Sequence, residues 1–93
     1  MIQVTGCVAT SHGGKYVTQL CKHWSHKLEV ELNETNGIVR FPDAVATMQA
    51  YSQGIALSIS GKDPEVLERL KGVIERHIDR FAFREAPLAY SWD

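Results

Sequence analysis

The chain has 93 residues, a length that forms a single domain, which we place over residues 1–93. Hydrophobic residues make up 44% and charged residues 23%, and this composition excludes an intrinsically disordered chain. The formal net charge of −1 excludes an overall field that attracts nucleic acid or an anionic membrane, although a local basic patch is compatible with it. We find no signal peptide and no apolar run of the roughly 18–20 residues that a membrane span needs. We therefore expect a cytoplasmic protein.

The first two predicted elements are a strand and a helix. Residues 2–10 alternate with a period of two and are rich in β-branched side chains, which predicts a strand. Residues 11–14 interrupt this pattern, and helical spacing follows from Lys15 to Leu28. One arc of that helix is apolar, and we expect burial of Tyr16, Leu20 and Trp24. The opposite arc is polar and mildly basic, and we expect it to expose Gln19, Lys22, His23 and His26.

Four further strands are predicted in succession, over residues 29–33, 38–41, 44–52 and 55–60. Asn36-Gly37 is expected to supply the positive φ angles of a tight hairpin turn between the first two of them. Pro42 is expected to end the second. Strands that follow one another through short turns form an antiparallel meander.

The second helix has a clear beginning and end. Asp63-Pro64-Glu65 combines a capping Asp, a Pro at the first helical position and a Glu in the first turn. An apolar stripe then runs to Phe81, and Pro87 marks the stop. Residues 88–92 alternate again and would add a short final strand. The order β-α-β-β-β-β-α predicts a two-layer α+β sandwich with two helices on one face of an antiparallel sheet. This topology is similar to that of the TATA-binding protein, without implying its function.

The stretch Gln19–Lys27 concentrates chemically versatile side chains and is the first candidate site. His23 and His26, at positions i and i+3, can share one helix face, and His12 from the preceding loop would complete three imidazoles for an open Zn²⁺ or Fe²⁺ site. Cys21 lies on another side of the helix and cannot join them. No Asp or Glu lies on this face, so the alternative is a set of solvated surface histidines.

An enzyme with His23 or His26 as general base is a second alternative, although neither has an evident nucleophile or acid partner. His77 falls within the apolar stripe of the second helix and is expected to be a core or rim histidine with one ring nitrogen hydrogen-bonded. Cys7 and Cys21 lack CxxC spacing and are expected to act as small buried hydrophobic residues.

Two segments carry a resemblance to a known family. Gln19-Leu20-Cys21-Lys22-His23-Trp24-Ser25-His26-Lys27, and Arg80-Phe81-Ala82-Phe83-Arg84-Glu85 followed by Trp92, resemble the bacterial domain of unknown function 2218. The resemblance runs from about Ala9 to the end of the chain. It also implies similarity to an extension of flavin-containing siderophore-interacting proteins, and hence a link to iron metabolism. It transfers no catalytic residue.

These observations predict an accessory or binding module rather than an enzyme, with a siderophore-linked protein or a small ligand as its partner. A third alternative is a structural protein that forms a homodimer through the uncovered face of the sheet. That face is expected to carry large apolar side chains which monomers usually avoid exposing. The residues expected there, or their alternates in the other register, are Val39, Phe41, Val45 and Tyr51.

Overall fold

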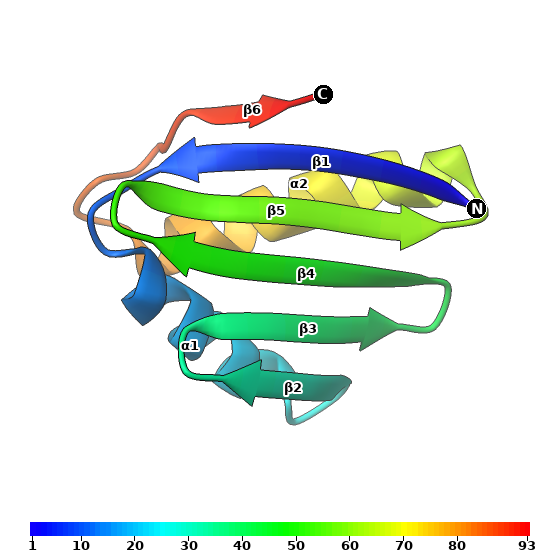
Figure 1. Cartoon of the computed structure of the whole chain (residues 1–93), viewed down its shortest axis with the longest axis horizontal. Helices are drawn as coiled ribbons and strands as arrows, with labels where there is room; N and C mark the ends of the chain where they lie inside the picture. The colour runs from blue at the N-terminus through cyan, green and yellow to red at the C-terminus, as the bar shows by residue number, and fades with distance from the viewer.

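The computed structural model describes all 93 residues as two helices and one six-stranded sheet. The strands are β1 (Ile2–Ala9), β2 (Glu29–Asn33), β3 (Asn36–Phe41), β4 (Ala44–Tyr51), β5 (Gly54–Gly61) and β6 (Tyr90–Trp92). The helices are α1 (Gly13–Trp24) and α2 (Pro64–Phe81). Every neighbouring pair of strands is antiparallel, and the order across the sheet is β2-β3-β4-β5-β1-β6 (Figure 1).

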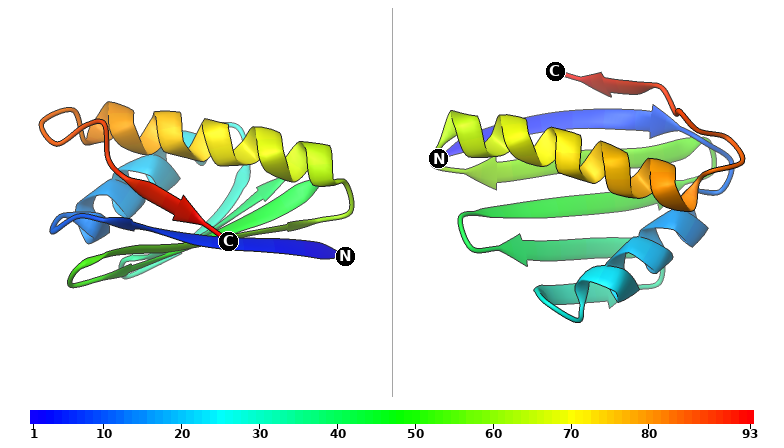
Figure 2. Two further views of the ribbon diagram at one scale, coloured as in Figure 1. Left: turned by 90° about the horizontal axis from the view of Figure 1, so that it is seen from above. Right: turned by 180° about the vertical axis from the view of Figure 1, so that it is seen from behind.

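Both helices lie on the same side of the sheet, and the other side is uncovered (Figure 2). The predicted fold class is therefore confirmed, and the tail of the chain adds the expected final strand β6 beside β1. Neither helix combines the length and the apolar character that a membrane-spanning helix needs.

The core lies between the sheet and the two helices. Alternate residues of the central strands point into it, among them Val8, Met48 and Ile59, each at most 1% exposed. Leu20 of α1 and Ile74 of α2 meet them from the other layer. α2 begins as predicted, because the Asp63 side chain accepts a 2.9 Å hydrogen bond from the backbone N–H of Glu65.

The bounds of α1 differ from the predicted Lys15–Leu28. The helix begins two residues earlier, at Gly13, and ends at Trp24. At its end the Ser25 hydroxyl donates a 2.8 Å hydrogen bond to the Lys22 carbonyl, and the backbone N–H of Leu28 bonds to the Trp24 carbonyl. His26 consequently lies in a turn after the helix.

The predicted Asn36-Gly37 turn is wrong. β2 and β3 pair up to Asn33 and Asn36, so the loop is Glu34-Thr35, and Glu34 has the positive φ of 56°. Gly37 lies within β3 and has no positive φ. This position requires glycine because a Cβ there would overlap the Cys21 Sγ of α1. Tertiary packing, not turn geometry, requires this glycine.

The uncovered face of the sheet is more polar than predicted. Val45 and Tyr51 do lie on it, 36% and 49% exposed. Val39 instead faces the helices with 0% exposure, and Phe41 packs edge-on against Trp24 with ring centroids 5.3 Å apart. The open face also carries Arg40, which lies opposite Val45 and pairs with two glutamates of β2. The placement of Val39 and Phe41 is thus corrected, because the register turns these residues inward. Homodimerisation itself stays a prediction.

Candidate functional site

The last turn of α1 packs against α2. Trp24 is 6% exposed, whereas His23 is exposed and rests its ring on α2, with centroids 5.7 Å from that of His77 and 6.0 Å from that of Phe81. The predicted orientation of the helix is confirmed, since the buried residues include Tyr16, Leu20 and Trp24, and the exposed ones include Lys22, His23 and His26. Gln19 differs, because it is only partly exposed and its Oε1 is buried.

The structure does not bring the three predicted ligand histidines together. His12 directly precedes α1 and His26 lies two residues after its end, and the 12 residues of the helix span about 18 Å. No group of three or more His, Cys, Asp or Glu side chains could hold a metal ion. Zn²⁺ or Fe²⁺ binding by His23 and His26 stays a prediction. Of the three predicted histidine ligands, His12 lies too far away to join these two. His77 is partly buried, and its Nδ1 donates a 2.7 Å hydrogen bond to the Val73 carbonyl, as expected for a rim histidine.

The carboxylate of Glu85 ties the segment after α2 to the start of α1. The Thr10 hydroxyl lies 3.1 and 3.0 Å from its two oxygens, and His12 Nδ1 lies 3.3 Å from Oε2. The Tyr16 hydroxyl donates a short hydrogen bond to the same Oε2. We call these four residues the Glu85 cluster. Thr10 and Tyr16 are 6% and 5% exposed, so the cluster closes the core at this end of the helix layer.

These hydrogen bonds act on ionisation in opposite directions. The hydrogen bond from Tyr16 lowers the pKa of Glu85, with smaller contributions from Thr10 and His12. The same bond to Glu85, together with burial, raises the pKa of Tyr16. Glu85 therefore stays ionised and Tyr16 stays protonated near neutral pH. Sequence reasoning missed this cluster, because nothing local places Glu85 beside a tyrosine 69 positions earlier.

The predicted general bases, His23 and His26, lie apart from the acidic side chains and from the hollows of the structure. The histidine that a carboxylate orients is His12, whereas the residues predicted as general bases, His23 and His26, form no ion pair with an acidic group. Neither of the two hollows in the structure is lined by a histidine. Enzymatic use of either histidine as a general base stays a prediction.

Unpaired basic side chains lie on both helices and in the segments that directly follow them. By the 3.6-residue period, Lys15 and Lys22 point away from the sheet on α1, and Arg76 and Arg80 do so on α2. Two more follow the ends of the helices. We call the whole set the basic face: Lys15, Lys22, Lys27, Arg76, Arg80 and Arg84. All six are exposed and none forms an ion pair.

Apart from Glu85, whose ionised carboxylate is directed into the Glu85 cluster at the start of α1, acidic residues lie away from this surface. α1 contains no Asp or Glu. On α2, Glu75 and Asp79 turn toward β6, where they accept hydrogen bonds of 2.7 Å from Trp92 Nε1 and 2.9 Å from the Tyr90 hydroxyl. Glu65 and Glu68 lie in the first part of α2, whereas His77 and Phe81, near its end, contact α1. The positive charge of the basic face is therefore not neutralised locally.

Comparison with known proteins places the chain in a family. The family described as "Uncharacterized protein conserved in bacteria (DUF2218)" matches residues 5–93. The chain belongs to this family. No curated protein matches it. Among solved structures, the "NMR structure of PA4090 from Pseudomonas aeruginosa" is 31% identical, with a TM-score of 0.86, and the similarity covers 100% of this chain and 96% of that one. The α+β fold is therefore that of a bacterial family whose members are described as uncharacterised.

Proposed function

We propose that this protein is an accessory binding module that recognises an acidic surface of a partner protein through the basic face. The observation that carries the proposal is the segregation of charge: six exposed Lys and Arg side chains without ion-pair partners lie on the two helices and in the segments that directly follow them, in a chain whose net charge is −1. Complementary charge raises association rates and selects partners more than it adds affinity. An accessory module needs such selective, reversible contact.

An exposed aromatic side chain beside the basic face supports a protein partner. Phe83 is 71% exposed, and the guanidinium carbon of Arg84 lies 5.7 Å from the centroid of its ring. Aromatic residues and arginines are enriched at protein–protein interfaces. The two segments that resemble the family also meet here, because His23 of the first packs against Phe81 of the second.

The link to iron metabolism is the finer part of the proposal. It is supported by the resemblance of the same segments to an extension of flavin-containing siderophore-interacting proteins. We place the partner among such siderophore-linked proteins and the encounter in the cytoplasm. The acidic surface that the basic face requires would then belong to that flavoprotein.

Amide NMR shifts during titration with poly-L-glutamate test the proposal. We expect shifts confined to residues 15–27 and 76–84, and we expect them to weaken as salt is raised, because exposed charges are screened within about 8 Å at physiological ionic strength. The double variant Arg76→Gln/Arg80→Gln should reduce the affinity several-fold. Arg69→Gln is the matched control, because Arg69 on the same helix already pairs with Asp43 at 3.8 Å.

Two outcomes would overturn the proposal. One is the absence of shifts on the basic face at low salt. The other is tighter binding of a DNA duplex than of poly-L-glutamate, which would assign the face to nucleic acid, a partner that the overall charge argues against. A purified siderophore-interacting flavoprotein then tests the finer part, since it should compete with poly-L-glutamate for the same amides.

A further inference from the structure

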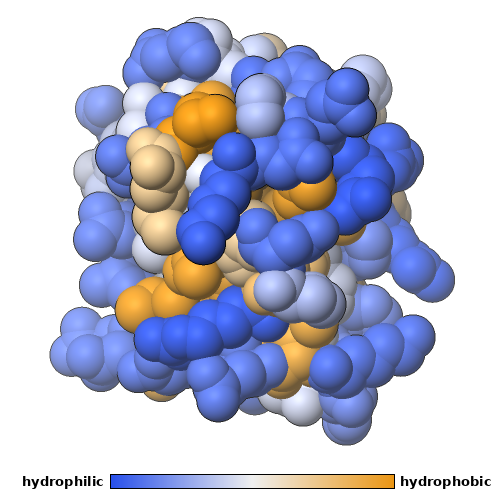
Figure 3. Space-filling view, turned by 90° about the vertical axis from the view of Figure 1, so that its right-hand side faces the viewer, coloured by the Kyte–Doolittle hydropathy of each residue, from blue (hydrophilic) through white to orange (hydrophobic).

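A hollow of about 420 Å³ lies at the end of the molecule opposite the Glu85 cluster, where β4 begins and β5 ends. Its lining residues are Met1, Phe41, Pro42, Asp43, Ala44, Val45, Ser60, Gly61, Lys62 and Asp63. Figure 3 views the molecule from this end and shows apolar patches between hydrophilic side chains. The volume falls in the range of roughly 300–1,000 Å³ that is typical of small-molecule sites.

Small residues keep this hollow open. Ala44 pairs with Gly61 across β4 and β5, so neither strand projects a large side chain at this point. A Cβ on Gly61 would lie 2.8 Å from Leu67 Cδ1 of α2 and 3.0 Å from the Asp43 carbonyl oxygen. The close approach of α2 thus requires glycine here. Larger apolar side chains flank the hollow, Phe41 on the helix side of the sheet and Val45 on its open face.

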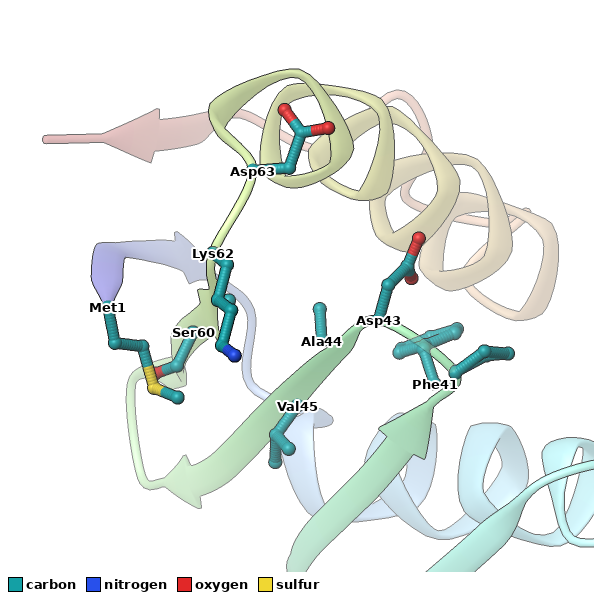
Figure 4. Close-up of a pocket in the computed structure, with 10 residues that line it drawn as sticks. Met1, Phe41, Asp43, Ala44, Val45, Ser60, Lys62 and Asp63 are labelled. Carbon is teal, nitrogen blue, oxygen red and sulfur yellow. The ribbon is translucent and has the colours of Figure 1, made fainter.

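One charged side chain at the hollow lacks a partner. Asp43 pairs with Arg69 at 3.8 Å, and Asp63 caps α2 through a 2.9 Å hydrogen bond from Glu65 N–H. Lys62 forms no ion pair. Figure 4 shows the two aspartates directed toward α2, whereas the Lys62 side chain extends away from α2, past Ser60 and toward Val45. Lys62 is therefore the charged lining side chain with neither an ion pair nor a hydrogen bond, while Asp63 keeps its negative charge and uses its carboxylate to cap α2.

We propose that the hollow binds a small apolar molecule that carries a single negative charge, such as a medium-chain carboxylate or an aromatic sulfonate. The apolar part would pack against Phe41 and Val45, and the anion would meet the Lys62 ammonium, a charge-assisted contact. This site is separate from the basic face, because none of the six basic-face residues lines the hollow. The inference therefore stands or falls independently of the proposed function.

The test uses 8-anilinonaphthalene-1-sulfonate and octanoate as probes of the full chain. We expect fluorescence enhancement of the first, and amide shifts at residues 43–45 and 60–62 with either probe. Lys62→Gln should weaken both affinities about fivefold, the loss expected for an exposed ion pair worth about 1 kcal/mol. Lys15→Gln, which removes an exposed charge from the basic face, should leave both affinities unchanged.

A second comparison isolates the role of charge. Octanol has the same chain length as octanoate but lacks the anion. The original chain should therefore bind octanol more weakly than octanoate. The affinity for octanol should be the same in the original chain and in Lys62→Gln. Shifts centred on the basic face, equal affinities of octanoate for the original chain and Lys62→Gln, or no shift with either probe at millimolar concentration would each overturn the inference.

Discussion

Glu85 shows at the scale of single residues how a polar group outside the regular elements fixes their relative position. Its carboxylate accepts hydrogen bonds from Thr10 and Tyr16, which precede and begin the first helix. Both donors are almost fully buried, so loss of the acceptor would leave them without a partner. The segment Arg80–Glu85 is thereby held against α1. Glu85, to which no role of its own was assigned from the sequence, is therefore a structural link.

The acid sensitivity of the fold follows from this link. The pKa of Glu85 is lowered in the folded state from its ordinary value of 4.5, so its contribution to stability is present above that pH and is lost as pH falls through the folded pKa. Tyr16→Phe removes the main cause of the shift. We expect the variant to have a lower free energy of unfolding than the original chain at pH 7, and we expect its free energy of unfolding to fall less steeply below pH 4.5.

Urea unfolding between pH 3 and pH 7 measures both effects. Tyr51→Phe is the control, because the side chain of Tyr51 is exposed on the open sheet face and donates no hydrogen bond to a carboxylate. The free energy of unfolding of Tyr51→Phe should show the same pH dependence as that of the original chain. An equally steep acid decline in Tyr16→Phe would show that Glu85 is not held by Tyr16.

The contact between α1 and β3 decides at the scale of elements how closely the helix approaches the sheet. Gly37 and Cys21 face each other across the layers, with no room for a Cβ on the glycine. We expect Gly37→Ala to destabilise the fold by about 2 kcal/mol, because overpacking forces side chains or backbone to move. The double variant Gly37→Ala/Cys21→Ala should lose less unfolding free energy than the two single variants lose in sum, because removal of Sγ makes room for the methyl group.

A second glycine provides the matched control for this prediction. Gly72 lies inside α2, where a Cβ would meet only the flexible end of the Arg76 side chain at 3.0 Å. Gly72→Ala should therefore stabilise the fold by up to about 1 kcal/mol through helix propensity. Thermal unfolding of the four variants gives all the values needed. Strict additivity of Gly37→Ala and Cys21→Ala would refute the proposed contact.

These two glycines illustrate what the sequence can and cannot predict. Local pattern was sufficient for all eight elements, including the cap at Asp63 and the final strand, because alternation, helical spacing and caps are properties of neighbouring residues. The role of Gly37, by contrast, depends on a cysteine in another layer, and the Glu85 cluster depends on residues some 70 positions apart. The sequence therefore predicted that His23 and His26 are exposed, but it did not predict which residues of α2 the His23 ring contacts.

At the scale of the whole molecule, β6 protects an edge of the sheet. Its three residues pair with Gly6, Cys7 and Val8 of β1. Without β6, the eight-residue strand β1 would be an open edge of the sheet. Trp92 lies across Gly6, whose Cβ would come 2.6 Å from the indole ring, and donates its 2.7 Å hydrogen bond to Glu75 of α2. The aromatic side chain thus joins β1, β6 and α2 in one contact.

Removal of residues 90–93 should expose the edge of β1 and promote association between copies. An unpaired strand edge offers backbone donors and acceptors to another chain, and natural sheets usually cover or shorten such edges. Trp92→Ala, which keeps the backbone of β6 but loses the contact with Gly6 and Glu75, should lower stability by about 2 kcal/mol. Light scattering over a concentration series compares the truncated chain, Trp92→Ala and Ser91→Ala, the last as a control because Ser91 is exposed.

The mass of the original chain in the same series also tests the predicted homodimer. A mass near 10.4 kDa at tens of micromolar would mean that the open sheet face does not pair two copies, and twice that mass would support pairing. The truncated chain should then show a further, concentration-dependent increase in mass, because the edge of β1 is a different surface from the open face. If the truncated chain has the same mass as the original at every concentration, β6 does not act as an edge cover.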